Sequence, residues 1–345
     1  MMIKPTRLKT GDKVAIVSLS WGGLGDEKLI HKYHIAKERL EKIFGLEVVT
    51  MPHALKGSDF VYNNPELRAK DLMDAFKDPS IKGIITAIGG DDSVRILPYI
   101  DYDVIHYNPK IFMGYSDTTV NHFVMNKAGV VSYYGPCIMK EFAEYGQMFD
   151  YTREAVERIL FSDTKGYEVP SCDYWSDDHI EWDEKNINAQ YKTQPETHHY
   201  EVLSGSGKIT GQLLGGCLDV FPMIVGTDIW PKVGDWKGKI LLLETSEEKP
   251  SPDYVTYYLR NLGAQGILNA INGIIVGKPQ DEQFYEEYKT VYLSVLKEFN
   301  CENLPIIYNV NIGHAMPIGI LPLGIEYEID LDKKIIRFAE SAVQE

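Results

Sequence analysis

Short apolar runs of strand length alternate with helix-like segments through the first part of the chain. The strand-like runs occupy residues 14–19, 46–51, 83–88 and 110–115. The helix-like segments, marked by apolar residues at helical spacing or by capping residues, occupy 28–44, 65–76, 93–99 and 118–128. Strands that alternate with helices predict a parallel, doubly wound sheet that is covered by helices on both faces.

The last part of the chain again mixes strands and helices. Residues 326–338 alternate apolar and polar positions and predict a hairpin that turns at Asp332 and Lys333. The other strand-like runs are 208–214, 239–244, 273–277 and 304–310, and the helix-like segments are 251–262 and 281–299. This part therefore predicts a second α/β unit.

An irregular segment separates the two parts. From about residue 162 to 205 the sequence is polar and aromatic with little periodicity, which is typical of a connection or a lid. The expected fold class is α/β, a doubly wound parallel-sheet N-terminal domain plus a smaller α/β C-terminal domain. We predict an N-terminal domain over 1–165, an aromatic connector over 166–205 and a C-terminal domain over 206–345.

The charge balance narrows the choice of partners. The 345 residues include 35 Lys plus Arg against 50 Asp plus Glu, which gives a net charge of −15. Such a surface repels phosphate backbones, so we expect no nucleic-acid partner, and a small anionic substrate needs a local positive field. No apolar run reaches the ~18 to 20 residues of a membrane span, and the basic N-terminus lacks a cleavage site. We therefore expect a cytoplasmic protein with no membrane partner.

Neither the cysteines nor the histidines form a metal motif. The four cysteines are far apart and include no CxxC pair, and a reducing cytoplasm suits them. His31 and His34 fall on an amphipathic helix, whereas His198 and His199 fall in the connector. No HExxH or carboxylate-rich ligand set occurs, so we expect no metal.

One serine stands where a strand-like run passes directly into a helix, in the sequence GYSDTT at 114–119. Such a corner exposes the hydroxyl of Ser116 at the carboxyl end of the sheet, where free N–H groups and the helix dipole can stabilise an oxyanion. The alternative is that Ser116, Asp117 or Thr118 simply caps the helix. The corner lacks the second glycine of GxSxG, so it is not the usual hydrolase elbow.

A glycine pair follows the neighbouring strand-like run, in GGDDS at 89–93. Gly89 and Gly90 allow the backbone to approach a ligand closely, and their amides can donate to an anion or oxyanion. A tight turn is the alternative, because the segment is neither a P-loop nor GxGxxG. Its placement favours a ligand role, since both loops leave strands at the edge where doubly wound sheets bind ligands.

A serine nucleophile needs a base and an acid that positions the base. Glu244 ends the strand-like run KILLLE, where a carboxylate is costly without a partner. Its alternative role is a solvated strand end or a salt bridge. His314 lies in the loop sequence NIGHAMP, in which a glycine allows a sharp turn, and its alternative role is structural.

The connector contains aromatic side chains that are able to line a pocket. Trp175 and Trp182, together with Tyr174 and Tyr200, can stack on a planar ligand such as a nucleobase. Packing of the irregular segment onto the body of the protein is the alternative role.

Five segments of the sequence match motifs of a known family and occur in the same order as in that family. They are LKTGDKVAIVSLS, NNPELRAKDLMDAFKDPSIKGIITAIGGDDSVRILPYID, MGYSDTT, GQLLGGCLDV with LLLETSE, and IGHAMPIGILPLG. Together they resemble the LD-carboxypeptidase family of serine peptidases, which includes the microcin C self-immunity proteins. The resemblance spans most of the chain.

The resemblance implies a Rossmann-like N-terminal domain with Ser116 as nucleophile and a C-terminal domain with His314 as base and Glu244 as the orienting acid. It also implies an oxyanion hole from the backbone amides of Gly90 and Asp117, a homodimer, and no metal or organic cofactor. The chain order of serine, acid and histidine agrees with the independent search for a base and an acid.

The sequence IGGDDS and the long connector around DYW resemble the microcin immunity branch, in which a connector tryptophan stacks on adenine. Trp175 is the first choice for this residue and Trp182 the second, and Gly89 and Asp91 complete the expected substrate-binding set. The acidic Asp91 and Asp92 depart from the more neutral residues common in this loop, which disfavours anion binding there.

The expected function is a serine hydrolase of the microcin C immunity type, which cleaves an amide bond near the carboxyl end of a small peptide or peptidyl-nucleotide. The alternative within the family is an LD-carboxypeptidase that releases D-Ala from murein tetrapeptide during wall recycling. An alternative from another class is a noncatalytic module in which the glycine loops bind a small anion.

Overall fold

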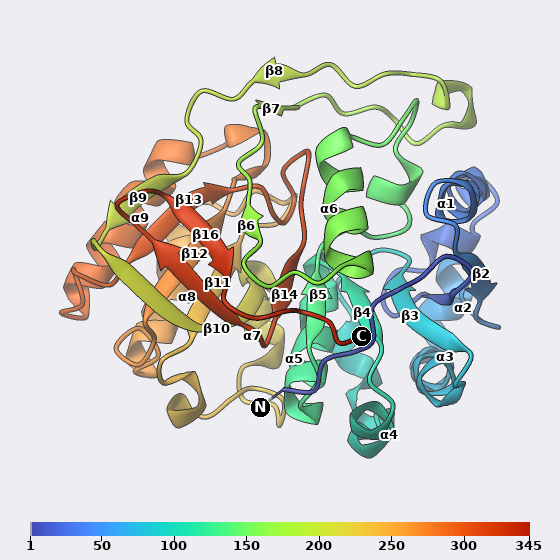
Figure 1. Ribbon diagram of the computed structural model, residues 1–345, viewed down its shortest axis with the longest axis horizontal. Helices are drawn as coiled ribbons and strands as arrows, with labels where there is room; N and C mark the ends of the chain where they lie inside the picture. The colour runs from blue at the N-terminus through green and yellow to red at the C-terminus, as the bar shows by residue number, and fades with distance from the viewer. Residues whose placement is uncertain (1) are drawn as a thin grey trace.

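The computed structural model describes residues 2–345 and contains two large sheets with a long connector across the top of the molecule (Figure 1). The first sheet has the strand order β14-β5-β4-β3-β1-β2, and every neighbouring pair is parallel except β14 with β5. Its strands are β1 (Lys13–Val17), β2 (Glu47–Thr50), β3 (Ile81–Thr86), β4 (Ile111–Gly114), β5 (Ser132–Tyr134) and β14 (Leu321–Leu323).

Helices cover both faces of this sheet. Val14 and Ile16 of β1 pack in one apolar cluster with the first helix, whereas Ala15 and Val17 pack in the other cluster with the third and fifth helices. This alternation confirms the doubly wound sheet. The helices are α1 (Ile30–Lys42), α2 (Ser58–Asn63), α3 (Pro65–Lys77), α4 (Tyr102–Tyr107), α5 (Thr119–Ala128) and α6 (Asp150–Phe161).

The second sheet has the order β6-β16-β15-β10-β11-β12-β13-β9. Its centre, from β10 to β13, is parallel, and antiparallel strands extend both edges. The strands are β6 (Glu168–Val169), β9 (Glu201–Ser204), β10 (Lys208–Cys217), β11 (Ile240–Glu244), β12 (Gly273–Gly277), β13 (Ile306–Val310), β15 (Glu326–Asp330) and β16 (Ile335–Phe338). The remaining elements are the helices α7 (Phe221–Ile224), α8 (Pro252–Ala264) and α9 (Tyr285–Glu298), and the short connector pair β7 (Tyr174–Trp175) and β8 (Gln194–Pro195).

The two sheets share a continuous interior. Each of the two apolar clusters contains strand residues from both sheets, for example Ile111 of β4 with Leu242 of β11. Residues 119–125 at the start of α5 are all buried, and the Thr119 hydroxyl accepts the Cys217 N–H at 3.0 Å where β10 ends. The carboxyl end of β10 is thereby fixed against the helix that follows β4.

The predicted fold class, two α/β units with a parallel doubly wound sheet first, is confirmed, and so is the hairpin of β15 and β16. The helix expected from residue 281 begins only at Tyr285, because Asp281, Glu282 and Phe284 have φ between 52° and 58° and cannot continue a right-handed helix. The sequence reading also missed β14, which crosses back to the first sheet. The domain limits at 165 and 206 stay a prediction.

Candidate active site

Ser116 occupies the sharp corner that the sequence predicts. β4 ends at Gly114, and Ser116 then adopts φ 61°, a left-handed conformation that strains a serine by about 1–3 kcal/mol. A Cβ at Gly114 would lie 2.1 Å from the Thr86 hydroxyl oxygen, so only glycine fits before the turn. The strain and the close packing both fix the serine at the carboxyl end of the sheet.

Helix capping does not explain the polar residues of this corner. Neither the short turn 116–118 nor α5 has a side-chain cap. Asp117 Oδ2 instead accepts the Ser93 N–H at 2.8 Å, and Thr118 Oγ1 lies 3.2 Å from Thr86 Oγ1. Asp117 and Thr118 thereby connect the corner to Ser93 and to the end of β3, and Ser116 lines a cavity.

The glycine loop after β3 packs directly against the serine. A Cβ on Gly89 would lie 2.8 Å from Ser116 Oγ and 3.1 Å from the Asp117 nitrogen, and a Cβ on Gly90 would lie 2.3 Å from Ser20 Oγ. Gly90 also has φ 141°. A side chain at position 89 would displace Ser116 and one at position 90 would displace Ser20, so the glycines serve close approach rather than only a turn.

Glu244 and His314 form a buried pair at the carboxyl ends of the second sheet. Glu244 ends β11, and its Oε2 lies 2.8 Å from His314 Nδ1. Gly313 has φ 88°, and a Cβ there would lie 2.4 Å from Glu244 Oε2, so glycine is required for the histidine loop to reach the acid. Solvated or surface roles for these two residues are excluded, because Glu244 is 1% and His314 8% exposed.

Tyr134, which the sequence reading missed, connects this pair to the serine corner. Its hydroxyl donates to Glu244 Oε1 at 2.5 Å and accepts the Ser116 N–H at 3.2 Å. Tyr134 ends β5, so the strand beside β4 holds both the serine backbone and the acid. A tyrosine in the run VVSYYG is an ordinary strand residue, and no local signal distinguishes it.

A second carboxylate, also missed, contacts the other side of the histidine ring. Glu247 Oε2 lies 2.9 Å from His314 Nε2. Burial opposes the charge of His314, but Glu244 and Glu247 outweigh it and raise its pKa from 6.5 to about 10. The hydrogen bond with His314 lowers the pKa of Glu247 to about 2. In this arrangement the imidazole is protonated at neutral pH, and Glu247 occupies the nitrogen that would serve Ser116.

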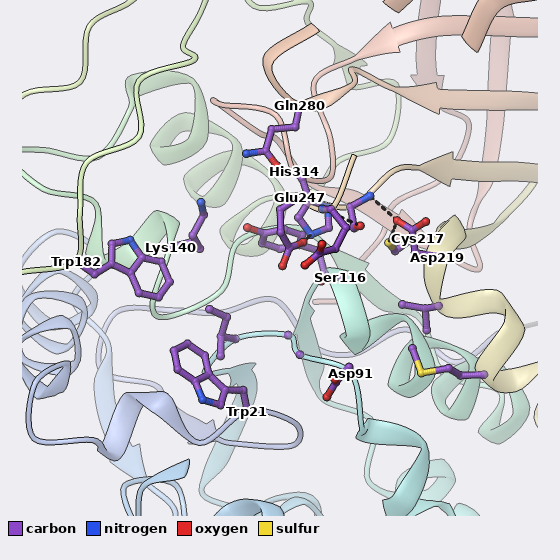
Figure 2. Close-up of a pocket in the computed structure, with 18 residues that line it drawn as sticks. Trp21, Asp91, Ser116, Lys140, Trp182, Cys217, Asp219, Glu247, Gln280 and His314 are labelled. Carbon is purple, nitrogen blue, oxygen red and sulfur yellow. Dashed lines mark hydrogen bonds and ion pairs between the residues drawn. The ribbon is translucent and has the colours of Figure 1, made fainter. Parts of the chain in front are cut away.

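The carboxyl ends of both parallel sheets open into one cavity of about 720 Å³ (Figure 2). The first sheet supplies Trp21, the glycine loop with Asp91, and Ser116. The second sheet supplies Cys217 at the end of β10, Asp219 just after it, Ser246 to Glu248 after β11, Gln280 after β12, and His314 after β13. The structure therefore brings the predicted serine, glycine loop and histidine to one cavity, with Glu244 behind the histidine.

The two connector tryptophans lie in different places. Trp182 lines the cavity, and its ring faces Trp21 with 6.5 Å between ring centres and 17° between planes. Trp175 is not part of the cavity wall. Its ring instead contacts Lys278, whose ammonium lies 4.6 Å from the ring centre. Trp182, the second choice from the sequence, is thus the connector tryptophan that lines the same cavity as Ser116.

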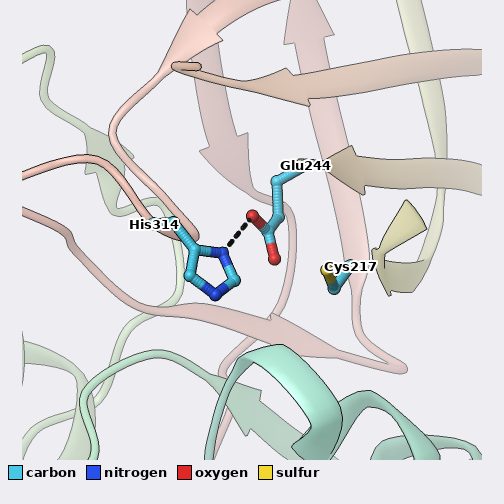
Figure 3. A group of neighbouring side chains, drawn as sticks. All are labelled: Cys217, Glu244 and His314. Carbon is cyan, nitrogen blue, oxygen red and sulfur yellow. Dashed lines mark hydrogen bonds and ion pairs between the residues drawn. The ribbon is translucent and has the colours of Figure 1, made fainter. Parts of the chain in front are cut away.

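Cys217, Glu244 and His314 bring three possible metal ligands within 4.8 Å of one another (Figure 3). Zinc binds cysteine as the thiolate. Burial, reinforced by Glu244 and Asp219, instead raises the pKa of the Cys217 thiol well above its usual range. The carboxylate already bonds to the ring nitrogen that faces it. We interpret the group as an acid–histidine pair packed beside a neutral thiol.

Family models match both halves of the chain. The LD-carboxypeptidase N-terminal domain matches residues 14–135, and the LD-carboxypeptidase C-terminal domain matches residues 210–329. The chain belongs to the LD-carboxypeptidase family. This family member is 30% identical to a putative carboxypeptidase of Vibrio cholerae over 99% of both chains. It is also 30% identical to the microcin C7 self-immunity protein MccF of Escherichia coli, over 79% of this chain and 78% of that one.

Solved structures of microcin immunity proteins are similar to this LD-carboxypeptidase family member. An MccF-like protein from Streptococcus pneumoniae in complex with AMP has a TM-score of 0.86 at 36% identity, over 95% of this chain and 98% of that one. MccF complexes with glutamyl sulfamoyl guanosine and with aspartyl sulfamoyl adenosine have a TM-score of 0.84 at 27% identity, over 99% of this chain and at least 99% of theirs. Within residues 2–345, no helix has the length and apolar character needed to cross a membrane.

Proposed function

We propose that this protein is a serine hydrolase that cleaves an amide bond between an acyl group and a nucleotide-like amine. The observation that carries the proposal is the meeting of Ser116, the glycine loop and the His314–Glu244 pair at one cavity. Membership of a carboxypeptidase family supports the peptidase chemistry, and the AMP and aminoacyl sulfamoyl complexes of its relatives support a nucleotide-bearing substrate. Cytoplasmic location and a homodimer stay predictions.

In the proposed reaction Ser116 Oγ attacks the scissile carbonyl while His314 Nε2, in its neutral form and released from Glu247, takes the hydroxyl proton. Glu244 holds the Nδ1 proton of His314 and stabilises the imidazolium that forms. The backbone amides of Gly90 and Asp117 stabilise the tetrahedral oxyanion. His314 then protonates the leaving nitrogen, and a water molecule hydrolyses the acyl-serine to return the free acid and the enzyme.

The near-parallel indoles of Trp21 and Trp182 support a base-binding role for that side of the cavity. Aromatic rings stack on planar heterocycles, and the two indoles lie in the wall of the cavity that contains Ser116, to one side of the serine (Figure 2). Lys140 lines the same side and offers a positive charge to a phosphate or sulfamoyl linkage. Asp91, also in the wall, offers only an acceptor.

A substrate panel tests the proposed function. The protein is incubated separately with an aminoacyl sulfamoyl adenosine panel, with a peptidyl-adenylate analogue and with murein tetrapeptide, and products are identified by mass spectrometry. We expect the acyl-nucleoside amides to be cleaved. Cleavage of the tetrapeptide alone would replace this substrate class by a D-Ala-releasing carboxypeptidase. A binding module is tested by a fluorophosphonate probe, which should label Ser116 and not a noncatalytic serine.

The Glu247→Gln variant should move the pH profile. His314 accepts a proton only when it is neutral, so kcat/KM of the natural enzyme should rise with pH toward about 10, the pKa that Glu247 helps to raise. Loss of that carboxylate lowers the pKa of His314, so the rising limb should shift to lower pH by roughly one unit or more. The measurement is kcat/KM from pH 5 to 10. An unchanged limb, like that expected of the exposed control Glu287→Gln, would refute the role of Glu247.

A further inference from the structure

The cavity has chemically different sides on either side of Ser116. In Figure 2, Trp182, Trp21 and Lys140 lie to one side of the serine, and Cys217 and Asp219 lie to the other. Lys140 is the only lysine or arginine among the described residues that line the cavity, whereas Asp91, Asp219, Glu247 and Glu248 bring four carboxylates. Positive charge in the cavity wall therefore comes from Lys140, and three of the four carboxylates, Asp219, Glu247 and Glu248, come from the second sheet.

The second sheet supplies what we call the acidic end, namely Asp219, Glu247, Glu248 and Gln280. Asp219 Oδ2 accepts the Ser246 N–H at 2.7 Å, which fixes it to the loop that carries both glutamates. In the part of the chain that the structure describes, none of the three carboxylates is ion-paired with a lysine or an arginine. Glu247 pairs only with His314. Within residues 2–345, the acidic end thus holds two carboxylates without an ion pair, Asp219 and Glu248, and a third, Glu247, whose partner is His314.

Gln280 provides a second, independent sign of a ligand here. Its side chain is 8% exposed and lines the cavity, beside His314 and Glu247 in Figure 2. Its amide oxygen is buried and has no hydrogen-bond partner within residues 2–345. Buried acceptors in folded proteins are almost always paired, so this oxygen is one that a donor on a ligand would satisfy.

We propose that the acidic end binds an acyl residue with a cationic side chain, such as lysyl or arginyl, next to the scissile carbonyl. This inference rests on the proposed function and names its acyl group. An ammonium or guanidinium has only donors, which match the carboxylates and the Gln280 oxygen. The aspartyl and glutamyl groups held by MccF would meet like charges here, which discriminates against them.

The position of Glu247 couples this recognition to the chemistry. The carboxylate of Glu247 contacts His314 Nε2 at 2.9 Å, although the side chain of Glu247 is 60% exposed. A substrate cation competes with the imidazolium for the same carboxylate. When Glu247 turns to the substrate, His314 loses one stabilising charge, releases its proton more readily, and presents Nε2 to Ser116. A cationic acyl group would therefore both bind and activate the base.

The test compares three ligands that differ only in the acyl side chain. Lysyl, norleucyl and glutamyl sulfamoyl adenosine are titrated into full-length Ser116→Ala protein by calorimetry, so that no hydrolysis interferes. All three carry the same α-ammonium, and norleucyl lacks only the side-chain charge. We expect lysyl to bind at least about 10-fold more tightly than norleucyl, and glutamyl to bind most weakly. Lysyl no tighter than norleucyl, or glutamyl as tight as lysyl, would overturn the inference. Binding of none of the three would remove the proposed function as well.

Charge reversal supplies the matched variants. Glu247→Lys, made in the Ser116→Ala protein, should weaken lysyl binding by about 10-fold and strengthen glutamyl binding. Glu248→Lys should act in the same direction. Glu302→Lys changes the net charge equally at an exposed site before β13, at the opposite end of the sheet, and should change neither affinity. An equal effect of Glu302→Lys would assign the preference to overall charge and overturn the inference.

Discussion

Replacing Ser116 by alanine should lower the rate of acyl-nucleoside amide hydrolysis by about 10⁶-fold, the scale seen when a triad nucleophile is removed. The hydroxyl of Ser116 is the group that forms the acyl intermediate in the proposed reaction, and the glycine loop packs so closely that a Cβ on Gly89 would lie 2.8 Å from its oxygen. The measurement is the initial rate of product formation, together with loss of fluorophosphonate labelling.

Alanine preserves the fold in this variant, because it removes one oxygen and keeps the Cβ that packs against Gly89. The melting temperature should therefore match that of the natural protein. Ser294→Ala, at an exposed serine of α9, is the matched control and should retain full activity. A rate within 10-fold of the natural one in Ser116→Ala would refute the serine mechanism.

The second large effect is expected from Glu244→Gln, which should lower kcat by about 10⁴-fold. The side-chain amide of glutamine can donate its NH₂ group to His314 Nδ1. The imidazole then carries its proton on Nε2, so Nε2 cannot accept the proton of Ser116. The shape of the side chain is retained, so the contacts with Tyr134 and Gly313 remain sterically possible. The rate is measured by the same product assay.

A spectroscopic readout separates this role from a structural one. In the natural protein the proton between His314 and Glu244 should give a far-downfield resonance that is lost in Glu244→Gln, while the far-ultraviolet circular dichroism stays the same. Exposed Glu287→Gln is the isosteric control. Full activity of Glu244→Gln would show that the carboxylate only fills space at the end of β11.

Much of the fold follows from local patterns. The run 14–19 predicts β1, and the alternation at 326–338 predicts the hairpin, because side chains of a strand point to opposite faces in turn. A short strand with no pattern of its own was missed. β14 contains a proline and only three residues, and it becomes a strand because Tyr134 and its neighbours in β5 offer an edge.

Some residues of the candidate site could likewise be predicted from the sequence, and others were found only in the structure. Ser116, Glu244 and His314 each stand beside a strand end or a glycine, which are signals that a sequence carries. The capping alternative at Ser116 was settled only by the structure, in which Asp117 bonds to Ser93 and Thr118 bonds to Thr86 at the end of β3. Nothing near Glu247 in the sequence distinguishes it from its neighbour Glu248.

The amino-acid sequence by itself determined the order of the elements, the strand-to-helix corner at Ser116 and the glycines that let two loops approach it, since these depend on neighbouring residues. The tertiary structure alone decided that Glu247 sits on His314, that Trp182 rather than Trp175 reaches the cavity, and that one side is acidic. Those features arise where the carboxyl ends of the two sheets meet. The distances between side chains from different strands depend on long-range packing, and local sequence preferences do not determine them.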